Sequence, residues 1–242
     1  MSMKSFVVER WSKILTILRK KISSIREEMS VVECWSRVFK ALRHISLFQI
    51  VPKSVREKPR FVEVWVVAFL LLSVIFLRIC SAPNLRWWEA FAVGLGVLRV
   101  WEVVIYQINV LLFDEYRARK KEYRLRKLKI TYVAYAIRGY RRIVVLLLHN
   151  YVESIFWFAL FYRNLDWAFQ TSRVSLNSFF GALNFSFVTM TTFGYTTIFP
   201  KETWADVVTL IQSAIGLFMA LLILARFISF LPKPETLDEF ER

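Results

Sequence analysis

The sequence predicts an all-α membrane protein with four transmembrane helices in each chain. Of its 242 residues, 56% are apolar and 17% are aromatic, a composition that favours lipid over a soluble fold. Four apolar segments are long enough to cross roughly 30 Å of hydrocarbon as helices. They cover approximately residues 61–80, 88–113, 141–162 and 204–230. We therefore expect the chain to cross the membrane four times.

A fifth apolar stretch, at about 176–190, is too short to span the bilayer comfortably. It leads into a Thr-rich segment that contains one Gly. Non-helical backbone at membrane depth is tolerated only where it is buried in protein or lines a water-filled cavity. We therefore expect a re-entrant helix and loop between the third and fourth transmembrane helices.

Basic residues predict the topology. Residues 1–60 carry 14 Lys and Arg against 5 acids, and residues 114–142 carry 11 against 3. The connections 81–87 and 163–203 hold only one and three basic residues. Because positively charged loops stay in the cytoplasm, we expect both termini and the 114–142 connection on the cytoplasmic side of a cell membrane. The loop after the short helix then opens to the outside.

The N-terminal 60 residues contain an internal repeat. The pattern Val-Val-Glu-x-Trp-Ser begins at Val7 and returns at Val31. Apolar residues recur at helical spacing in both copies, which predicts two basic amphipathic helices. These helices could pack as a hairpin, lie on the inner leaflet or form a regulatory ligand site. Pro52 and Pro59 interrupt the pattern ahead of the first span.

The connection between the second and third spans interleaves five tyrosines with its Lys and Arg residues. Such a mixture can mark nucleic-acid binding, but a segment that joins two spans lies beside the inner leaflet. Anionic lipid headgroups attract basic segments there. We therefore expect anionic inner-leaflet lipids as the partner of this connection, and no nucleic acid.

Three charged residues lie inside the predicted spans. Arg99 and Glu102 are one helical turn apart in the second span, and Glu153 lies at a similar depth in the third. Each would cost several kcal/mol if it faced lipid, so we expect the three to face the protein interior and pair. An Arg99–Glu153 pair between the two helices is predicted. It could act as a structural clamp or take part in gating.

The most informative segment follows the short apolar helix and reads Thr189-Met-Thr-Thr-Phe-Gly-Tyr-Thr-Thr-Ile-Phe-Pro200. A cation filter needs a short run whose backbone carbonyls replace water around an ion, with a hydroxyl closing its inner end. Thr192 offers the hydroxyl, and Gly194 is free to adopt unusual backbone angles. Tyr195 adds an aromatic ring to wedge the loop. The pattern indicates a pore.

These residues resemble the potassium-channel pore family, whose filter reads T-x-x-T-V-G-Y-G-D with a Pro a few residues on. The resemblance covers about residues 141–230 and implies an outer helix, a pore helix, a filter and an inner helix. It also implies a homotetramer, because one loop per chain supplies a quarter of the carbonyl cage. Five positions match in register, namely Thr189, Thr192, Gly194, Tyr195 and Pro200. Potassium or sodium would bind at the carbonyls of Thr192, Phe193, Gly194 and Tyr195.

Two positions depart from the family pattern. Thr196, the outermost member of the predicted filter, replaces the second filter Gly, and Thr197 replaces the Asp. A β-branched residue pays roughly 1–3 kcal/mol to take the conformation of that Gly. We therefore expect a splayed outer carbonyl ring and reduced selectivity for potassium over sodium. Alternatively, Thr196 turns outward and the inner sites alone give potassium selectivity.

The last span carries the predicted gate. Gly216 lies where the resemblance places the hinge glycine of the inner helix, although it could equally permit close packing. Counting helical turns from Gly216 puts Ala220 and Leu224 on the same face, so the inner mouth should be apolar. Four leucines at a constriction can block ions by dewetting.

We therefore predict a tetrameric cation channel that has no enzymatic activity and no cofactor besides permeant monovalent cations. No paired carboxylates, phosphate-binding loop or metal-ligand spacing is evident in the sequence. The alternatives are a non-conducting, channel-like scaffold and an effector pore that depolarises the membrane. The predicted regions are the cytoplasmic repeat (1–60), a first helix pair (61–113), the basic connection (114–140), a pore domain (141–231) and a short cytoplasmic tail (232–242).

Overall fold

The computed structural model describes residues 30–56, 58–79, 86–127, 140–171, 175–194 and 197–228. It is mostly helical, and the chain separates into two compact units, residues 1–45 and 46–242. In the first unit, the described residues form helix α2 (Val31–Leu42), which is the second copy of the repeat. The apolar side chains of Val31 and Trp35 are exposed on this helix. The first copy of the repeat lies outside the described residues.

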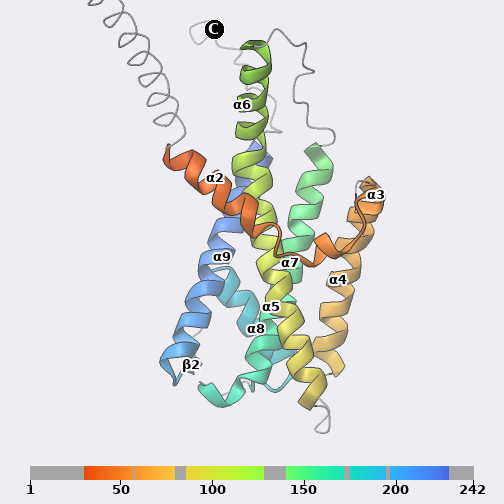
Figure 1. The fold of residues 1–242 in the computed structure, drawn as a ribbon. Helices are drawn as coiled ribbons and strands as arrows, with labels where there is room; N and C mark the ends of the chain where they lie inside the picture. Colours follow the sequence, from red (N-terminus) through yellow and green to blue (C-terminus); the bar gives the residue numbers. More distant parts are fainter. Residues whose placement is uncertain are drawn as a thin grey trace, which may run out of the picture. The chain divides into compact units, whose positions relative to one another are not determined.

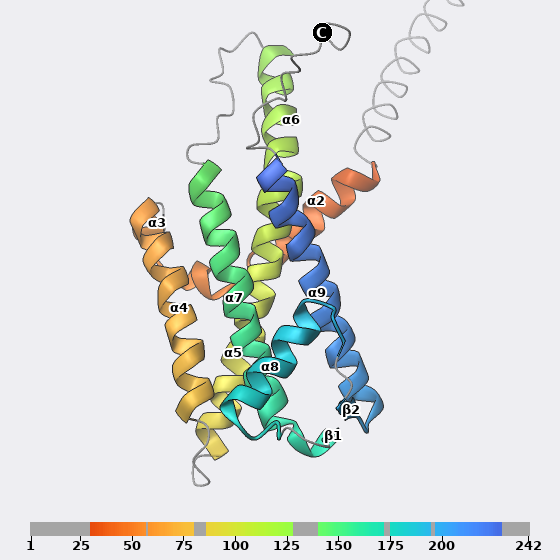
Figure 2. The ribbon, with the colours of Figure 1, turned by 180° about the vertical axis from the view of Figure 1, so that it is seen from behind.

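The second unit contains four long apolar helices that run alongside one another (Figure 1, Figure 2). They are α4 (Pro59–Ile79), α5 (Arg86–Ile108), α7 (Tyr140–Asn164) and α9 (Thr203–Ile228). Each is long and apolar enough to cross a membrane. Their positions agree with the four predicted spans to within a few residues. A short turn, η1 (Leu47–Ile50), and the four-residue α3 (Lys53–Arg56) precede α4.

Helix α5 continues beyond the length that a bilayer requires. It passes through a π-helical turn, η2 (Asn109–Phe113), into α6 (Asp114–Lys127). Such turns are rare and interrupt the regular hydrogen-bond ladder of the α-helix, which gives scope for side-chain support. Arg117 provides it by donating to the carbonyl and the side-chain oxygen of Asn109, at 3.3 and 2.8 Å. The candidate membrane span that begins in α5 covers 37 residues, Trp87–Tyr123, so the charged α6 extends past the hydrocarbon core.

Between α7 and α9 the chain makes a short excursion. It contains η3 (Asp166–Ala168), β1 (Phe169–Thr171), α8 (Phe179–Met190) and β2 (Ile198–Pro200). The hydroxyl of Ser178 caps α8 by accepting from the Gly181 N–H at 2.9 Å. The antiparallel pairing of β1 with β2 brings the end of the excursion back beside its beginning, with Gln170 opposite Phe199. The 12 residues of α8 are too few to span a bilayer.

Helix α7 lies at the centre of the unit. It packs against α4, α5, α8 and α9, and 56% of its apolar window is buried, against 17% for α9. The main core is aromatic, with Trp157 and Tyr162 of α7 fully buried beside Phe185 of α8. Gly96 lets α5 approach this core, since an added Cβ there would meet the Trp157 ring at 2.6 Å. The inner helix α9 thus has far fewer contacts within its own chain than the outer helix α7.

Candidate functional site

The loop of the predicted filter begins directly at the C-terminal end of α8. The N–H groups of Thr191, Thr192 and Phe193 donate to carbonyl oxygens in the last turns of the helix, at 3.0, 3.2 and 3.1 Å. These bonds satisfy carbonyl groups that a helix end would otherwise leave without partners. The loop is therefore fixed to α8, and a movement of this helix would carry the loop with it.

The backbone of the loop alternates in handedness. Thr192 has a φ of 60° and Gly194 a φ of 77°, whereas Phe193 between them does not have a positive φ. A strand keeps φ negative at every residue, so these two positive φ values take the loop out of strand geometry. A positive φ at the β-branched Thr192 costs about 1–3 kcal/mol, and such strain is typical of functional sites.

The described filter residues are uncovered in the single chain. Thr192, Phe193 and Gly194 are all exposed, and the Phe193 side chain is 81% exposed despite being apolar. The hydroxyl of Thr192 donates to the carbonyl of Thr191 at 2.7 Å. The other two predicted filter residues, Tyr195 and Thr196, lie outside the described residues.

Gly216 allows the main chains of α9 and α8 to touch. It is buried, and a Cβ added to it would lie 2.0 Å from the carbonyl oxygen of Met190, the last residue of α8. Real Cβ atoms are essentially never found below 3.0 Å from a non-bonded heavy atom of another residue. Of the two interpretations that the sequence left open, close packing is the one that this contact supports.

The predicted gate residues lie on the uncovered side of α9. Ala220 and Leu224 are exposed, Leu224 to 55%. Leu217 and Leu221 are exposed as well, which makes this side of the helix a continuous apolar surface. No other described residue of the single chain covers Ala220 and Leu224, so a gate here would need further copies of the helix.

A buried network of hydrogen bonds joins α7, α8 and α9. The hydroxyl of Tyr162 on α7 donates to Oε1 of Gln212 on α9 at 2.6 Å. Nε2 of Gln212 donates to the carbonyl and the hydroxyl of Ser186 on α8, at 2.9 and 2.8 Å. The Ser186 hydroxyl donates back to the carbonyl of Ile155 on α7 at 2.7 Å. Tyr162, Gln212 and Ser186 are all fully buried.

The three intramembrane charges form one buried cluster. Arg99 makes a two-pronged pair with Glu153, at 2.7 and 2.9 Å, as the sequence predicted. Nη1 of Arg99 lies 3.4 Å from Oε2 of Glu102. The Trp157 indole adds a third donor to Glu153 at 3.0 Å, and the Arg99 guanidinium lies over the Phe69 ring, 4.6 Å from its centre. Paired and hydrogen-bonded in this way, the charges can be buried.

Glu102 also holds the segment that precedes the first span. Its Oε1 accepts from the hydroxyl of Ser46 at 2.9 Å and from the N–H of Phe48 at 3.2 Å. Phe48 packs edge-on against Trp65 of α4, with the ring centres 5.6 Å apart. The segment that leads to the first span is therefore tied to α5 and α4.

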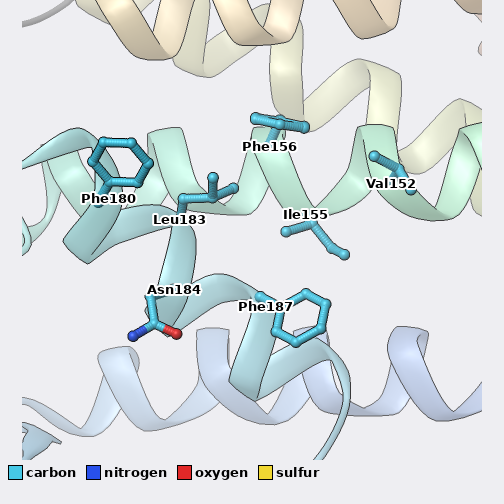
Figure 3. Close-up of a pocket in the computed structure, with 7 residues that line it drawn as sticks. All are labelled: Val152, Ile155, Phe156, Phe180, Leu183, Asn184 and Phe187. Carbon is cyan, nitrogen blue, oxygen red and sulfur yellow. The ribbon is translucent and has the colours of Figure 1, made fainter.

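An apolar hollow of about 350 Å³ lies between α7 and α8 (Figure 3). Six of the seven lining side chains are apolar, and the seventh is Asn184. Replacing water around a cation requires several oxygen ligands. One amide among apolar groups does not provide them, so this hollow is unsuited to binding an ion. Its lining consists of Val152, Ile155, Phe156, Phe180, Leu183, Asn184 and Phe187.

Comparison with known families identifies the class of the C-terminal part. Residues 146–233 match the family model described as Ion channel, the two-helix, potassium-channel-like pore family. The match contains most of α7 and all of α8, the loop and α9. The predicted resemblance is thus confirmed for this segment. The chain carries an ion-channel domain and is a multi-pass membrane protein. No curated protein and no solved structure matches the chain significantly.

Three features of the site were not predicted from the sequence. The strained φ of Thr192 was missed because a family pattern gives residue types but no dihedral angles. Gln212 was missed although a polar residue in an apolar span is itself a signal that it has a buried partner. The bonds from Ser46 and Phe48 to Glu102 join positions more than 50 residues apart, and no local pattern reveals such a contact.

Proposed function

We propose that four copies of this chain form a cation channel that conducts potassium, and other monovalent cations less well, through a filter at residues 192–196. The carbonyls of these residues would face a common axis. No reaction or cofactor is involved in this proposal. The first two transmembrane helices, α4 and α5, would pack outside the pore formed by α8 and α9.

The observation that carries the proposal is the loop at the end of α8. It follows a short apolar helix, lies in the segment that matches the channel family, and alternates in handedness between Thr192 and Gly194. A helix C-terminus also carries partial negative charge, which favours a nearby cation. The loop contains several backbone carbonyls and the Thr192 hydroxyl within a short stretch, whereas the hollow between α7 and α8 is lined by one amide and apolar side chains.

The exposed apolar surface supports a symmetric assembly. The exposed leucines of α9 follow one another at intervals of seven, four and three residues, which is the spacing of side chains along the contact line between two paired helices. Phe193 is 81% exposed at the end of α8. One chain supplies one loop, and a cage around an ion requires several. The seam consists of Leu210, Leu217, Leu221 and Leu224, all more than half exposed.

We propose reduced selectivity because of Thr196 and Thr197, which replace the Gly and the Asp of the family pattern. The outermost carbonyl ring would be splayed, and fewer fitted sites would discriminate less between potassium and sodium. We also propose that both termini are cytoplasmic in a cell membrane, with the basic residues near anionic inner-leaflet lipids.

Ion flux from purified protein in liposomes tests this proposal. We expect potassium and sodium to pass and chloride to be excluded. Gly194→Ala and Gly94→Ala form a matched pair, since an added Cβ meets nothing within 4 Å at either position, and only Gly194 has a positive φ. Gly194→Ala should therefore lose most of the flux, and Gly94→Ala should retain it. Absence of flux through the unmodified protein would favour the non-conducting scaffold.

A further inference from the structure

The amide of Gln212 closes a circuit of hydrogen bonds around the pore helix. The circuit runs from Tyr162 on α7 to Gln212 on α9, to Ser186 on α8, and back to Ile155 on α7. Every polar atom of the Gln212 amide group takes part in it. Since the side chain is fully buried, an amide without these partners would be costly.

The circuit lies close to the filter loop along a rigid element. Ser186 precedes Thr192 by six residues, roughly 9 Å along a helix axis. The next contacts between α9 and α8 continue toward the loop. Ser213 donates to the Thr189 carbonyl at 3.3 Å, and Gly216 meets the carbonyl of Met190. Three residues on one face of α9, at positions 212, 213 and 216, therefore contact the α8 carbonyls of residues 186, 189 and 190, up to the start of the loop.

The hydrogen bonds of Gln212 fix the direction in which α8 packs, which apolar contacts alone do not. Apolar contact is non-directional and depends mainly on the buried area, whereas hydrogen bonds weaken steeply when distance or angle changes. Gly216 sets how closely α9 approaches α8. Gln212 sets the rotation of α8 and its position along its axis, because its amide group must reach Ser186 and Tyr162 together.

We propose that Gln212 is a positioning residue for the filter, whose buried amide holds α8 in the orientation that presents residues 192–194 to the ion path. The inference rests on the proposed function, since it concerns the same filter. It adds a consequence: a shift of the inner helix α9 is transmitted to the filter loop through Gln212. The residue does not touch the ion and acts only through α8.

The test compares full-length protein in lipid nanodiscs with three variants. Gln212→Met keeps the length of the side chain and removes the amide. Tyr162→Phe removes one donor and keeps both bonds from Gln212 to Ser186. The double variant removes the amide together with the Tyr162 hydroxyl that donates to it. Thr209→Val is the matched control, because it removes a hydroxyl of α9 that bonds only within its own helix, to the Asp206 carbonyl at 2.8 Å.

Two measurements are made on each protein. The first is hydrogen exchange at the N–H groups of Thr191, Thr192 and Phe193, which does not depend on conduction. The second is the permeability ratio of potassium to sodium from reversal potentials. We expect Gln212→Met and the double variant to exchange about tenfold faster at these amides, through easier local opening. Both variants should also change the permeability ratio. Tyr162→Phe removes one of the bonds to the amide and should have a smaller effect on both measurements, and Thr209→Val should match the unmodified protein.

The double variant separates positioning from mere stability. If it folds like the unmodified protein and shows unchanged exchange at residues 191–193, the amide only compensates its own burial and the inference is overturned. If the unmodified protein passes no ions, the proposed function fails, and the exchange rates alone decide the inference. Faster exchange in the double variant would then still support a positioning role for Gln212.

Discussion

Gly216→Ala perturbs a close main-chain contact between the inner helix α9 and the pore helix α8. The added Cβ would lie 2.0 Å from the Met190 carbonyl oxygen, 2.9 Å from its carbon and 3.1 Å from its Cα. Ordinary contact begins at 3.4 Å, so the two backbones must separate by about 1.4 Å to restore van der Waals spacing. A flexible side chain could move aside, but a backbone carbonyl at the end of a helix cannot do so without moving the helix.

We expect this substitution to lower the free energy of unfolding by about 3 kcal/mol, the upper end of the usual cost of overpacking. The measurement is equilibrium unfolding in mixed micelles, followed by tryptophan fluorescence. Gly94→Ala is the control. An added Cβ meets nothing within 4 Å there, and replacing a helical Gly by Ala should stabilise by at most about 1 kcal/mol.

A second variant tests whether the contact is with the main chain. Met190→Ala shortens the side chain and leaves the carbonyl in place, so it should not rescue Gly216→Ala. Rescue by Met190→Ala, or equal stability of Gly216→Ala and the unmodified protein, would refute the close approach of α9 to α8. Unchanged stability with altered channel opening would instead favour the hinge interpretation of Gly216.

Three further predictions concern the charge cluster, the gate and the filter. Arg99→Met should lower the free energy of unfolding by about 3–5 kcal/mol, because it leaves two buried carboxylates without a cation. Glu153→Gln should lower it less, because Arg99 keeps Glu102 as an acidic partner. Equal unfolding midpoints for the two variants would contradict this order. Leu224→Asn should raise resting conductance in planar bilayers, because a polar ring at the inner mouth would be wetted; unchanged conductance would place the gate elsewhere. Thr196→Gly combined with Thr197→Asp should increase the potassium-to-sodium permeability ratio, and an unchanged ratio would mean that these two positions do not limit selectivity.

The long helices could be predicted from the sequence because their signal is local. A span needs about 20 consecutive apolar residues, and each of the four segments provides them within one window. The Arg99–Glu153 pair was predictable for a related reason. A charge inside a span must find a partner, and few charged side chains lie at a suitable depth.

The other features of the site could not be predicted from the sequence, because they depend on how the helices pack in three dimensions. Ser186 and Gln212 are 26 residues apart, and only the packing of α8 against α9 brings the hydroxyl to the amide. The same packing decides that Gly216 provides a close approach, which its place in the sequence left open. The positive φ of Thr192 depends on how the loop leaves α8, and β-branched residues seldom adopt it.

The most direct test of the central claim is the reversal potential of the unmodified protein in a planar bilayer with potassium chloride on one side and sodium chloride on the other. A cation channel with a weakened filter predicts a current without a chloride component. Its reversal potential should be displaced toward that of potassium and still fall short of full potassium selectivity. A current carried by chloride would contradict the assignment of a cation channel. A reversal potential at the potassium limit, with no measurable sodium current, would contradict the reduced selectivity.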